Sequence, residues 1–373
     1  MNSFEPGHLV SQKDFKSFIP SELNRKWRFT DPALLYQLSK ADRALGQLDT
    51  FSELVDLDLY VTMHKTKEAT LSSRIEGTRT HFEEVFLDVS AVSRERRDDW
   101  EEVKNYLTAL EAALALSQRL PFSSRFIRAV HKPLMQGVRG ERKLPGEFRS
   151  TQNWIGGSMP SNASFVPPPA HELPRLMGDL EKFANDDRDL IPGLVKTALL
   201  HYQFETIHPF LDGNGRVGRL LITTFLVERG LLRTPILYLS AYLERNRQQY
   251  YHHLSEVRTT GNLTAWLQFF LRGVEETAND GVATFREILK LERSMTERLR
   301  PLGARAARAH LAIRYLFRNP VITPLDLQPA LDTTPATIYR LVTQLAELGI
   351  LTPVATPTRQ QYYAFNEYIH LFR

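Results

Sequence analysis

A short stretch between two helical patterns constrains the fold of this 373-residue chain more than any other feature. Residues 194–207 carry apolar side chains at helical spacing. Residues 220–227 continue a second apolar helix, and Gly230 stands where a helix C-cap is expected. The stretch between them, HPFLDGNGRVGR at residues 208–219, is therefore predicted to be a loop that runs into a helix N-terminus.

The residue types of this loop predict a phosphate-binding site. Gly213 and Gly215 let the backbone approach a ligand and point its N–H groups into one concavity, beside the positive end of the helix dipole. Arg216 and Arg219 are three residues apart, so both guanidinium groups can reach the same side and bind phosphate oxygens. Asp212 offers a hard oxygen ligand beside those phosphates, which suits Mg²⁺.

His208 stands at the entrance of the loop, where the titration range of an imidazole fits a general base acting on a hydroxyl. The whole stretch resembles the active-site motif of the Fic family, HPFx(D/E)GNGRxxR, at every fixed position. Two glycines alone would be equally consistent with a turn that starts a helix. The number of matching residue types favours the family.

The resemblance implies a mainly α fold: a Fic-type helical core with a β-hairpin flap, an N-terminal helical inhibitory region and a C-terminal winged helix domain. It also implies a protein adenylyltransferase that moves AMP from ATP to a Ser, Thr or Tyr hydroxyl of a target protein or of the chain itself, with Mg²⁺ or Mn²⁺ as cofactor. His208 would be the catalytic base and Asp212 the metal ligand. The residues implied to bind ATP and its phosphates are Gly213, Asn214, Gly215, Arg216, Val217, Gly218, Arg219 and Tyr251.

A second motif, SSRIEGT at residues 72–78, ends a predicted helix over residues 51–76. It resembles the inhibitory motif (S/T)xxxE(G/N) of Fic proteins, with Ser72 and Glu76 one turn apart on one face. If Glu76 pairs with Arg219, that guanidinium is not available to the γ-phosphate and ATP binds in a poorly aligned pose. Our hypothesis is that Glu76 inhibits the enzyme; the alternative is an ordinary glutamate on a solvated helix end.

The region at 138–169 has no helical period and is rich in glycine and proline. Within it, residues 146–157 alternate loosely and end in a Gly-Gly turn, which predicts a short hairpin. In Fic proteins the corresponding element is a flap whose strand edge receives an extended segment of the target protein. The four flap residues implied to lie near the nucleotide are Asn153, Trp154, Ile155 and Gly156. A surface loop without function is the alternative.

Several other residues have less specific signals for a role in the site. Of the neighbours Tyr250 and Tyr251, only one can face a pocket, and the resemblance assigns Tyr251 to the adenine side. Many relatives have an asparagine where Arg258 stands here, although an arginine can still stack or donate. His131 and His201 are interpreted as packing residues inside helices.

The last segment, residues 304–373, is predicted to contain three helices followed by a hairpin, the order of a winged helix-turn-helix domain. Its third helix would present polar side chains to solvent that suit base-edge contacts in DNA: Thr337, Arg340, Thr343 and Gln344. Seven arginines oppose four acidic residues in this segment, a modest net charge of +3 for a DNA-binding domain. DNA binding and protein docking or dimerisation therefore stay equally open.

The predicted domains are an N-terminal helical region at 1–118 with the inhibitory motif at 72–77, a Fic catalytic core at 119–275, a connecting helix at 276–303 and the winged helix domain at 304–373. Two or three domains are also what the length suggests.

Composition limits the function classes further. The net charge of +4 gives no strong field for nucleic acid or an anionic membrane. The absence of cysteine excludes disulfides, thiolate metal sites and a thiol nucleophile. No signal peptide and no run of ~18 apolar residues is found, so a soluble, cytoplasmic protein without a membrane partner is expected.

Three alternatives to AMP transfer stay open. The chain could be a DNA-binding transcriptional regulator that uses the Fic core as a nucleotide sensor. It could instead be a Fic enzyme that removes AMP, or one that transfers another phosphate-containing group. The oligomeric state also stays open, with a homodimer as one alternative because relatives often dimerise.

Overall fold

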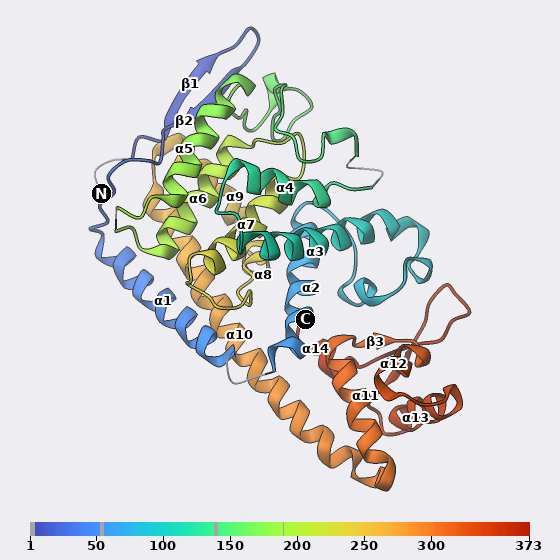
Figure 1. The fold of residues 1–373 in the computed structure, drawn as a ribbon. Coiled ribbons are helices and arrows are strands. Elements are labelled where there is room, and N and C mark those ends of the chain that lie inside the picture. The colour runs from blue at the N-terminus through green and yellow to red at the C-terminus, as the bar shows by residue number, and fades with distance from the viewer. Residues whose placement is uncertain (1–3, 53–55, 138–140, 189) are drawn as a thin grey trace. The chain divides into compact units, whose positions relative to one another are not determined.

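The computed structural model describes all residues except 1–3, 53–55, 138–140 and 189. It is mainly helical and divides into two compact units, residues 1–46 with 105–278 and residues 47–104 with 279–373 (Figure 1). The helices α1 (Pro32–Ser52), α3 (Arg97–Ser117) and α10 (Leu263–Leu299) each contribute residues to both units. These units group the segments differently from the four sequence domains, which stay predictions.

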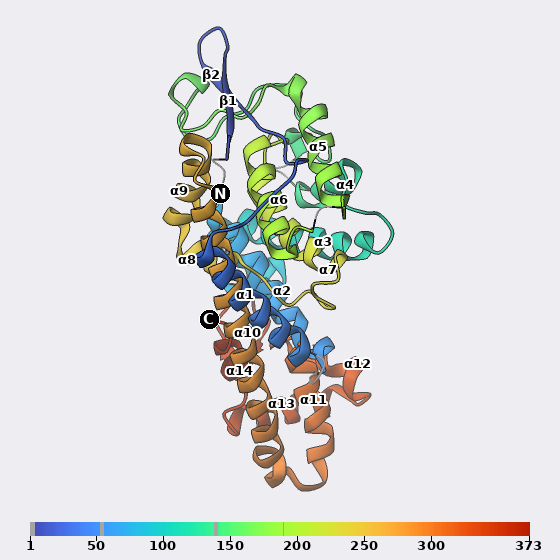
Figure 2. The same cartoon turned by 90° about the vertical axis from the view of Figure 1, so that its left-hand side faces the viewer.

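The first unit is built around α6 (Gly193–Ile207) and α7 (Asn214–Glu228), which lie side by side in both views (Figure 1, Figure 2). Residues 194–207 are all buried, so α6 is a central helix rather than an amphipathic surface helix. The surrounding elements are α4 (Ser124–Leu134), α5 (Leu173–Asn185), α8 (Ser240–Arg245) and α9 (Arg247–Thr260), together with the strands β1 (Gly7–Ser11) and β2 (Lys16–Pro20).

Residues 7–20 form a β-hairpin within the N-terminal region, which the sequence predicts to be helical. The strands β1 and β2 pair antiparallel, with Gly7 opposite Pro20. The N–H of Phe18 donates to the carbonyl of Val166 at 2.9 Å, which ties β2 to the chain that returns from the flap region. The hairpin is thus supported by a tertiary contact that local sequence does not reveal.

In the second unit, α2 (Leu57–Ile75) packs on α11 (Ala306–Arg318). The other elements are the strands β3 (Val321–Ile322), β4 (Thr352–Val354) and β5 (Tyr362–Ala364), the helices α12 (Gln328–Leu331), α13 (Pro335–Glu347) and α14 (Asn366–His370), and the 3-10 turns η1 (Phe82–Phe86), η2 (Val89–Ala91), η3 (Arg94–Arg96), η7 (Arg300–Arg305) and η8 (Pro324–Leu327). The three strands form an antiparallel sheet in the order β3-β5-β4.

Several helix boundaries differ from the predicted ones. The helix predicted over residues 51–76 is α2, which begins at Leu57; residues 51 and 52 belong to α1, and residues 53–55 lie outside the described residues. The helix α1 runs through Gly46 and ends at Ser52. Beyond the neighbouring backbone of the helix, no atom lies within 4 Å of the position that a Cβ of Gly46 would take, so an alanine would fit there. Glycine inside a helix costs about 1 kcal/mol relative to alanine, which the helix sustains. Most of the predicted connecting helix at 276–303 is the second part of α10, which already begins at Leu263 and ends at Leu299; residues 300–303 belong to η7.

Among the described residues, no helix is both long and apolar enough to cross a membrane.

Candidate functional site

The turn between α6 and α7 brings His208 and the N-terminus of α7 together. His208 caps α6 in the left-handed conformation, with φ 50° and ψ 61°, and its N–H donates to the carbonyl of Phe204 at 2.9 Å. A non-glycine residue in this region is uncommon and strained, and such strain gathers at functional sites. Gly213, with φ 77°, makes the second sharp turn and α7 starts at Asn214.

The imidazole of His208 has a defined orientation. Its Nδ1 lies 3.3 Å from the backbone carbonyl of Glu205. Because a carbonyl oxygen only accepts, this contact assigns the proton to Nδ1 and leaves the lone pair on Nε2. That is the tautomer a general base requires.

The loop between the two helices is closed by Asn214. Its side-chain oxygen accepts from the N–H of Phe210 at 2.8 Å, and its amide nitrogen donates to the carbonyl of the same residue at 2.9 Å. Both polar atoms of the Asn214 side chain are therefore already hydrogen-bonded within the loop. A phosphate at this position would meet the backbone N–H of Asn214 rather than its carboxamide.

His131 on α4 also supports the loop, a role that the sequence interpretation missed. Its ring stacks on Phe210 with centroids 3.7 Å apart and planes 8° apart. The N–H of Gly146 donates to Nδ1 at 2.9 Å, so Nε2 carries the proton and donates to the carbonyl of Asp212 at 3.1 Å. Burial lowers the pKa of His131 to about 4 and keeps the ring neutral. No sequence signal marks these pairings, because His131 and Asp212 are 81 residues apart.

Arg149 is a second residue that the sequence interpretation missed. It is only 2% exposed, and it donates to the carbonyls of Thr151 at 3.1 Å, Pro168 at 2.6 Å and His208 at 3.0 Å. Its backbone N–H donates to the carbonyl of Pro209 at 2.9 Å. Burial lowers the pKa of Arg149 to about 10. One buried guanidinium thus joins both ends of the flap region to the end of α6.

The predicted hairpin at 146–157 is reduced to one isolated antiparallel bridge, between Ile155 and Phe165. Gly156 and Gly157, both with φ 70°, follow the bridge and start the connecting turn. The side chain of Asn153 donates to the carbonyls of His208 at 3.2 Å and Phe210 at 2.8 Å. The role of Asn153, Trp154, Ile155 and Gly156 at a nucleotide stays a prediction.

On the predicted phosphate side, Arg216 and Asp212 lie close together. The Nη2 of Arg216 is 3.9 Å from Asp212 Oδ1 and 3.8 Å from the sulfur of Met135. The side chain of Asp212 is 48% exposed, and its Oδ1 accepts from the N–H of Gly213 at 2.6 Å. No group of three or more His, Cys, Asp or Glu side chains that could hold a metal ion occurs in the described part of the chain. Since Mg²⁺ bound to a nucleotide uses one or two carboxylates together with phosphates and waters, Asp212 fits such an ion.

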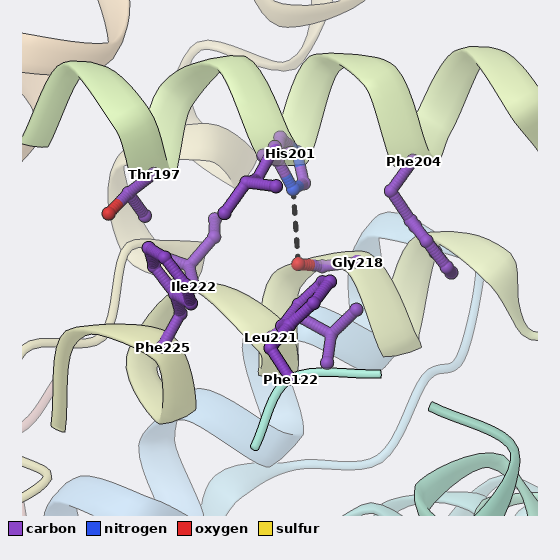
Figure 3. Close-up of a pocket in the computed structure, with 9 residues that line it drawn as sticks. Phe122, Thr197, His201, Phe204, Gly218, Leu221, Ile222 and Phe225 are labelled. Carbon is purple, nitrogen blue, oxygen red and sulfur yellow. Dashed lines mark hydrogen bonds between the residues drawn. The ribbon is translucent and has the colours of Figure 1, made fainter. Parts of the chain in front are cut away.

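Gly218 forms the contact between the two central helices. Figure 3 shows the ring of His201 reaching from α6 to the carbonyl of Gly218, at 3.1 Å. The other ring nitrogen lies 2.9 Å from the hydroxyl of Tyr250. Burial lowers the pKa of His201 to about 3. The pocket in Figure 3 is otherwise lined mainly by apolar side chains, which agrees with the interpretation of His201 as a packing residue.

The two neighbouring tyrosines on α9 differ in burial. Tyr250 is buried and Tyr251 is 43% exposed. The role of Tyr251 at the adenine stays a prediction. Arg258, also on α9, places its guanidinium carbon 3.9 Å from the ring centroid of Phe165 and donates from Nε to Thr206 Oγ1 at 3.1 Å. Arg258 therefore both stacks and donates, in each case to protein groups.

The inhibitory motif lies in the second unit. The helix α2 ends at Ile75, Glu76 is its C-cap, and Gly77 follows with φ 108°. Ser72 is buried. The pairing of Glu76 with Arg219 stays a prediction.

Two family models match the chain. Residues 121–226 match the one described as Fic/DOC family, and residues 35–115 match the one described as Fic/DOC family N-terminal.

Curated relatives are similar over part of their length. The protein adenylyltransferase Fic of Drosophila grimshawi is 32% identical over 164 residues, which cover 44% of this chain and 31% of that protein. A probable protein adenylyltransferase of Aquifex aeolicus (strain VF5) is 34% identical over 134 residues, 36% of each chain. The match thus spans about a third of the length of these relatives.

Solved structures share the fold. A Fic family protein from Desulfovibrio desulfuricans G20 superposes with a TM-score of 0.59 at 22% identity, covering 91% of this chain and 98% of the other. A fragment of Fic-1 from C. elegans gives a TM-score of 0.52 at 20% identity, covering 70% and 75%.

Proposed function

The chain is a Fic family protein with Fic and Fic N-terminal domains, homologous to protein adenylyltransferases, and we propose that it transfers AMP from ATP to a Ser, Thr or Tyr hydroxyl of a target protein. The observation that supports this most directly is the turn between α6 and α7. There His208, with its proton assigned to Nδ1, stands next to a glycine-bounded helix N-terminus. A general base beside an anion-binding helix end is what transfer of a phosphate-containing group to a hydroxyl requires.

In the proposed reaction, Nε2 of His208 takes the proton of the target hydroxyl while the oxygen attacks the α-phosphorus of ATP. A new P–O bond forms, the bond to the β-phosphate oxygen breaks, and pyrophosphate leaves with that electron pair. The backbone N–H groups of Asn214 and Gly215 hold the α-phosphate, since the N–H of Gly213 already donates to Asp212, and Arg216 and Arg219 hold the outer phosphates. Asp212 would hold Mg²⁺, which supplies positive charge to offset the charge of the phosphates.

Glu76 is proposed to restrain this activity. In the proposal its carboxylate pairs with Arg219, so that ATP lacks one γ-phosphate partner and its α-phosphorus is not aligned for attack. Its place at the C-terminal end of α2, with Ser72 one turn earlier, supports this reading of the motif. Modification of the chain itself and a homodimer belong to the same proposal.

A comparison of two labelled nucleotides tests the transferred group. With α-³²P-ATP the protein fraction should gain label, and with γ-³²P-ATP it should not, because only AMP is retained. Label from γ-³²P-ATP would instead indicate phosphate transfer. Loss of AMP from a previously labelled target, without transfer, would indicate the AMP-removing alternative.

A second candidate function is DNA binding by residues 304–373, as a winged helix-turn-helix domain. The order α11, β3, α12, α13, β4, β5 and the antiparallel β3-β5-β4 sheet support it. Two exposed arginines of the segment also support DNA binding. Arg340 on α13 and Arg359 between β4 and β5 are exposed, and neither makes an ion pair with a residue that the structure describes.

Salt-dependent binding of the whole chain to duplex DNA would support this function. Arg340→Ala and Arg359→Ala should weaken binding and reduce its salt dependence, since each removes a phosphate or base contact. Arg305→Ala, which removes the same charge before α11, is the matched control. Binding that is unaffected by Arg340→Ala and Arg359→Ala would favour a protein-docking role for the segment.

A further inference from the structure

Glu205 brings a carboxylate close to His208. It stands one helical turn before His208 on α6 and is only 6% exposed. Its Oε2 lies 4.0 Å from Nδ1 of His208, and its backbone carbonyl lies 3.3 Å from the same nitrogen. Both the main chain and the side chain of one residue therefore face the ring nitrogen that does not act as the base.

The position of this carboxylate depends on Gly218. A Cβ atom at residue 218 would overlap Glu205 Oε1, and it would stand 3.2 Å from a ring carbon of Phe204. The missing side chain on α7 is thus what gives the Glu205 carboxylate room between the two central helices. A positional requirement of this kind indicates that Gly218 acts through Glu205 and not only through a nucleotide.

Other charged and titratable groups surround the pair. Arg258 on α9 interacts electrostatically with both Glu205 and Tyr202. Burial lowers the pKa of Arg258, and the interactions with Tyr202 and Glu205 raise it in part. From the flap region, Arg149 binds the His208 carbonyl. On α7, Arg216 and Arg219 are both buried, and the guanidinium of Arg216 lies against Asp212 and Met135. Arg258 is therefore a cationic neighbour of the Glu205 carboxylate, and an opposite charge favours the ionised form of a carboxyl group.

We propose that Glu205 is the positioning residue for His208: its carbonyl fixes the Nδ1–H tautomer, and its carboxylate stabilises the imidazolium that forms when Nε2 takes the proton of the target hydroxyl. This inference rests on the proposed role of His208 as the base. Glu205 stays ionised throughout. The proton remains on Nε2 until it passes to solvent after transfer, so no further acid or base is needed.

The test measures the imidazole of His208 directly and so does not depend on activity. The protein is labelled with ¹³C at Cε1 of its 11 histidines, and the His208 resonance is identified by its loss in His208→Gln. Titration by NMR then gives the pKa of His208 in each variant. Glu205→Gln keeps the size of the side chain and removes its charge, so the pKa of His208 should fall by about one pH unit or more.

Two further variants test whether the pKa of His208 depends on the position of the Glu205 carboxylate. Gly218→Ala keeps the carboxylate in the chain and displaces it, so it should lower the pKa of His208 in the same direction. Glu228→Gln is the control, because Glu228 on α7 is half-buried and accepts a hydrogen bond from the N–H of Phe122. It should leave the pKa of His208 unchanged.

Activity adds a second readout. Glu205→Gln should lower kcat roughly tenfold with little change in the KM for ATP, because a weaker base acts at an intact nucleotide site. An unchanged pKa of His208 in folded Glu205→Gln overturns the inference, whether or not the wild-type chain transfers AMP. A shifted pKa in a chain that transfers nothing supports the positioning and contradicts only the proposed function.

Discussion

The ring of Tyr60 on α2 packs edge-on against Phe317 on α11, with centroids 5.4 Å apart. Tyr60 also contacts Tyr368, and its hydroxyl donates to Glu292 at 3.1 Å. One turn later on α2, His64 contacts Phe372 at 4.9 Å. The helix that ends in the predicted inhibitory motif therefore shares a core with the C-terminal segment.

Because of that shared core, Phe317→Leu is expected to loosen α2 and raise AMP transfer, since Glu76 would be held less firmly. In a Glu76→Gly background, Phe317→Leu should not raise AMP transfer any further, because the inhibitory carboxylate is already absent. Label from α-³²P-ATP is the measurement. Phe365→Leu is the control, because its ring contacts are with Phe317 and Tyr368 inside the C-terminal segment. Equal activity of Phe317→Leu and wild type would show that α2 does not depend on this core.

Arg149→Lys is expected to destabilise the fold by roughly 2–3 kcal/mol, because a lysine cannot reproduce the donors that bind the carbonyls of Pro168 and His208. AMP transfer should fall further than ATP binding, since the base would lose its orientation. Thermal unfolding and label transfer measure the two effects. Arg175→Lys, at an exposed arginine that pairs with Glu22, should change neither. A fully active Arg149→Lys variant would contradict the role assigned to Arg149.

Gly213→Ala is expected to weaken ATP binding. An alanine at φ 77° is strained by about 1–2 kcal/mol, and its Cβ would stand 2.7 Å from the sulfur of Met135. Gly230→Ala is a matched control, because Gly230 has φ 67° but nothing within 4 Å of its Cβ position. It should share the strain and bind ATP normally in calorimetry. Equal ATP affinity in the two variants would argue against the loop as the phosphate site.

The stability of the fold should fall as the pH is lowered below about 6.5. Burial lowers the pKa of His201 to about 3. Between about pH 6.5 and pH 3, His201 therefore binds a proton in the unfolded chain but stays neutral in the folded chain. Each pH unit in this window costs up to roughly 1.4 kcal/mol for one such group. The free energy of unfolding of His201→Gln, measured by urea denaturation, should therefore depend less on pH than that of wild type. Parallel pH profiles would mean that the pKa of His201 is the same in the folded and the unfolded chain, which contradicts the lowered pKa.

The local features of the site could be predicted from the sequence because they depend on neighbouring residues. The loop at 208–213, the start of α7 and its end near Gly230 follow from glycine positions and apolar spacing. The residues that hold the loop could not be predicted, because their partners are distant. His131 and Arg149 reach Asp212 and His208 across 81 and 59 residues.

Glu205 was missed for another reason. It lies within a helix whose residues 194–207 are all buried, so the sequence pattern does not distinguish it from the core. Only the contact with His208 Nδ1, and the space left by Gly218, single it out. The hairpin β1–β2 was missed in the same way, since its support is the bond from Phe18 to Val166.

The most direct test of the central claim is label transfer from α-³²P-ATP with Mg²⁺, compared between wild type, Glu76→Gly and the double variant Glu76→Gly with His208→Ala. A transferase restrained by Glu76 predicts little label in wild type, more in Glu76→Gly and none in the double variant. No label in any of the three, with ATP binding intact, would contradict AMP transfer by this chain.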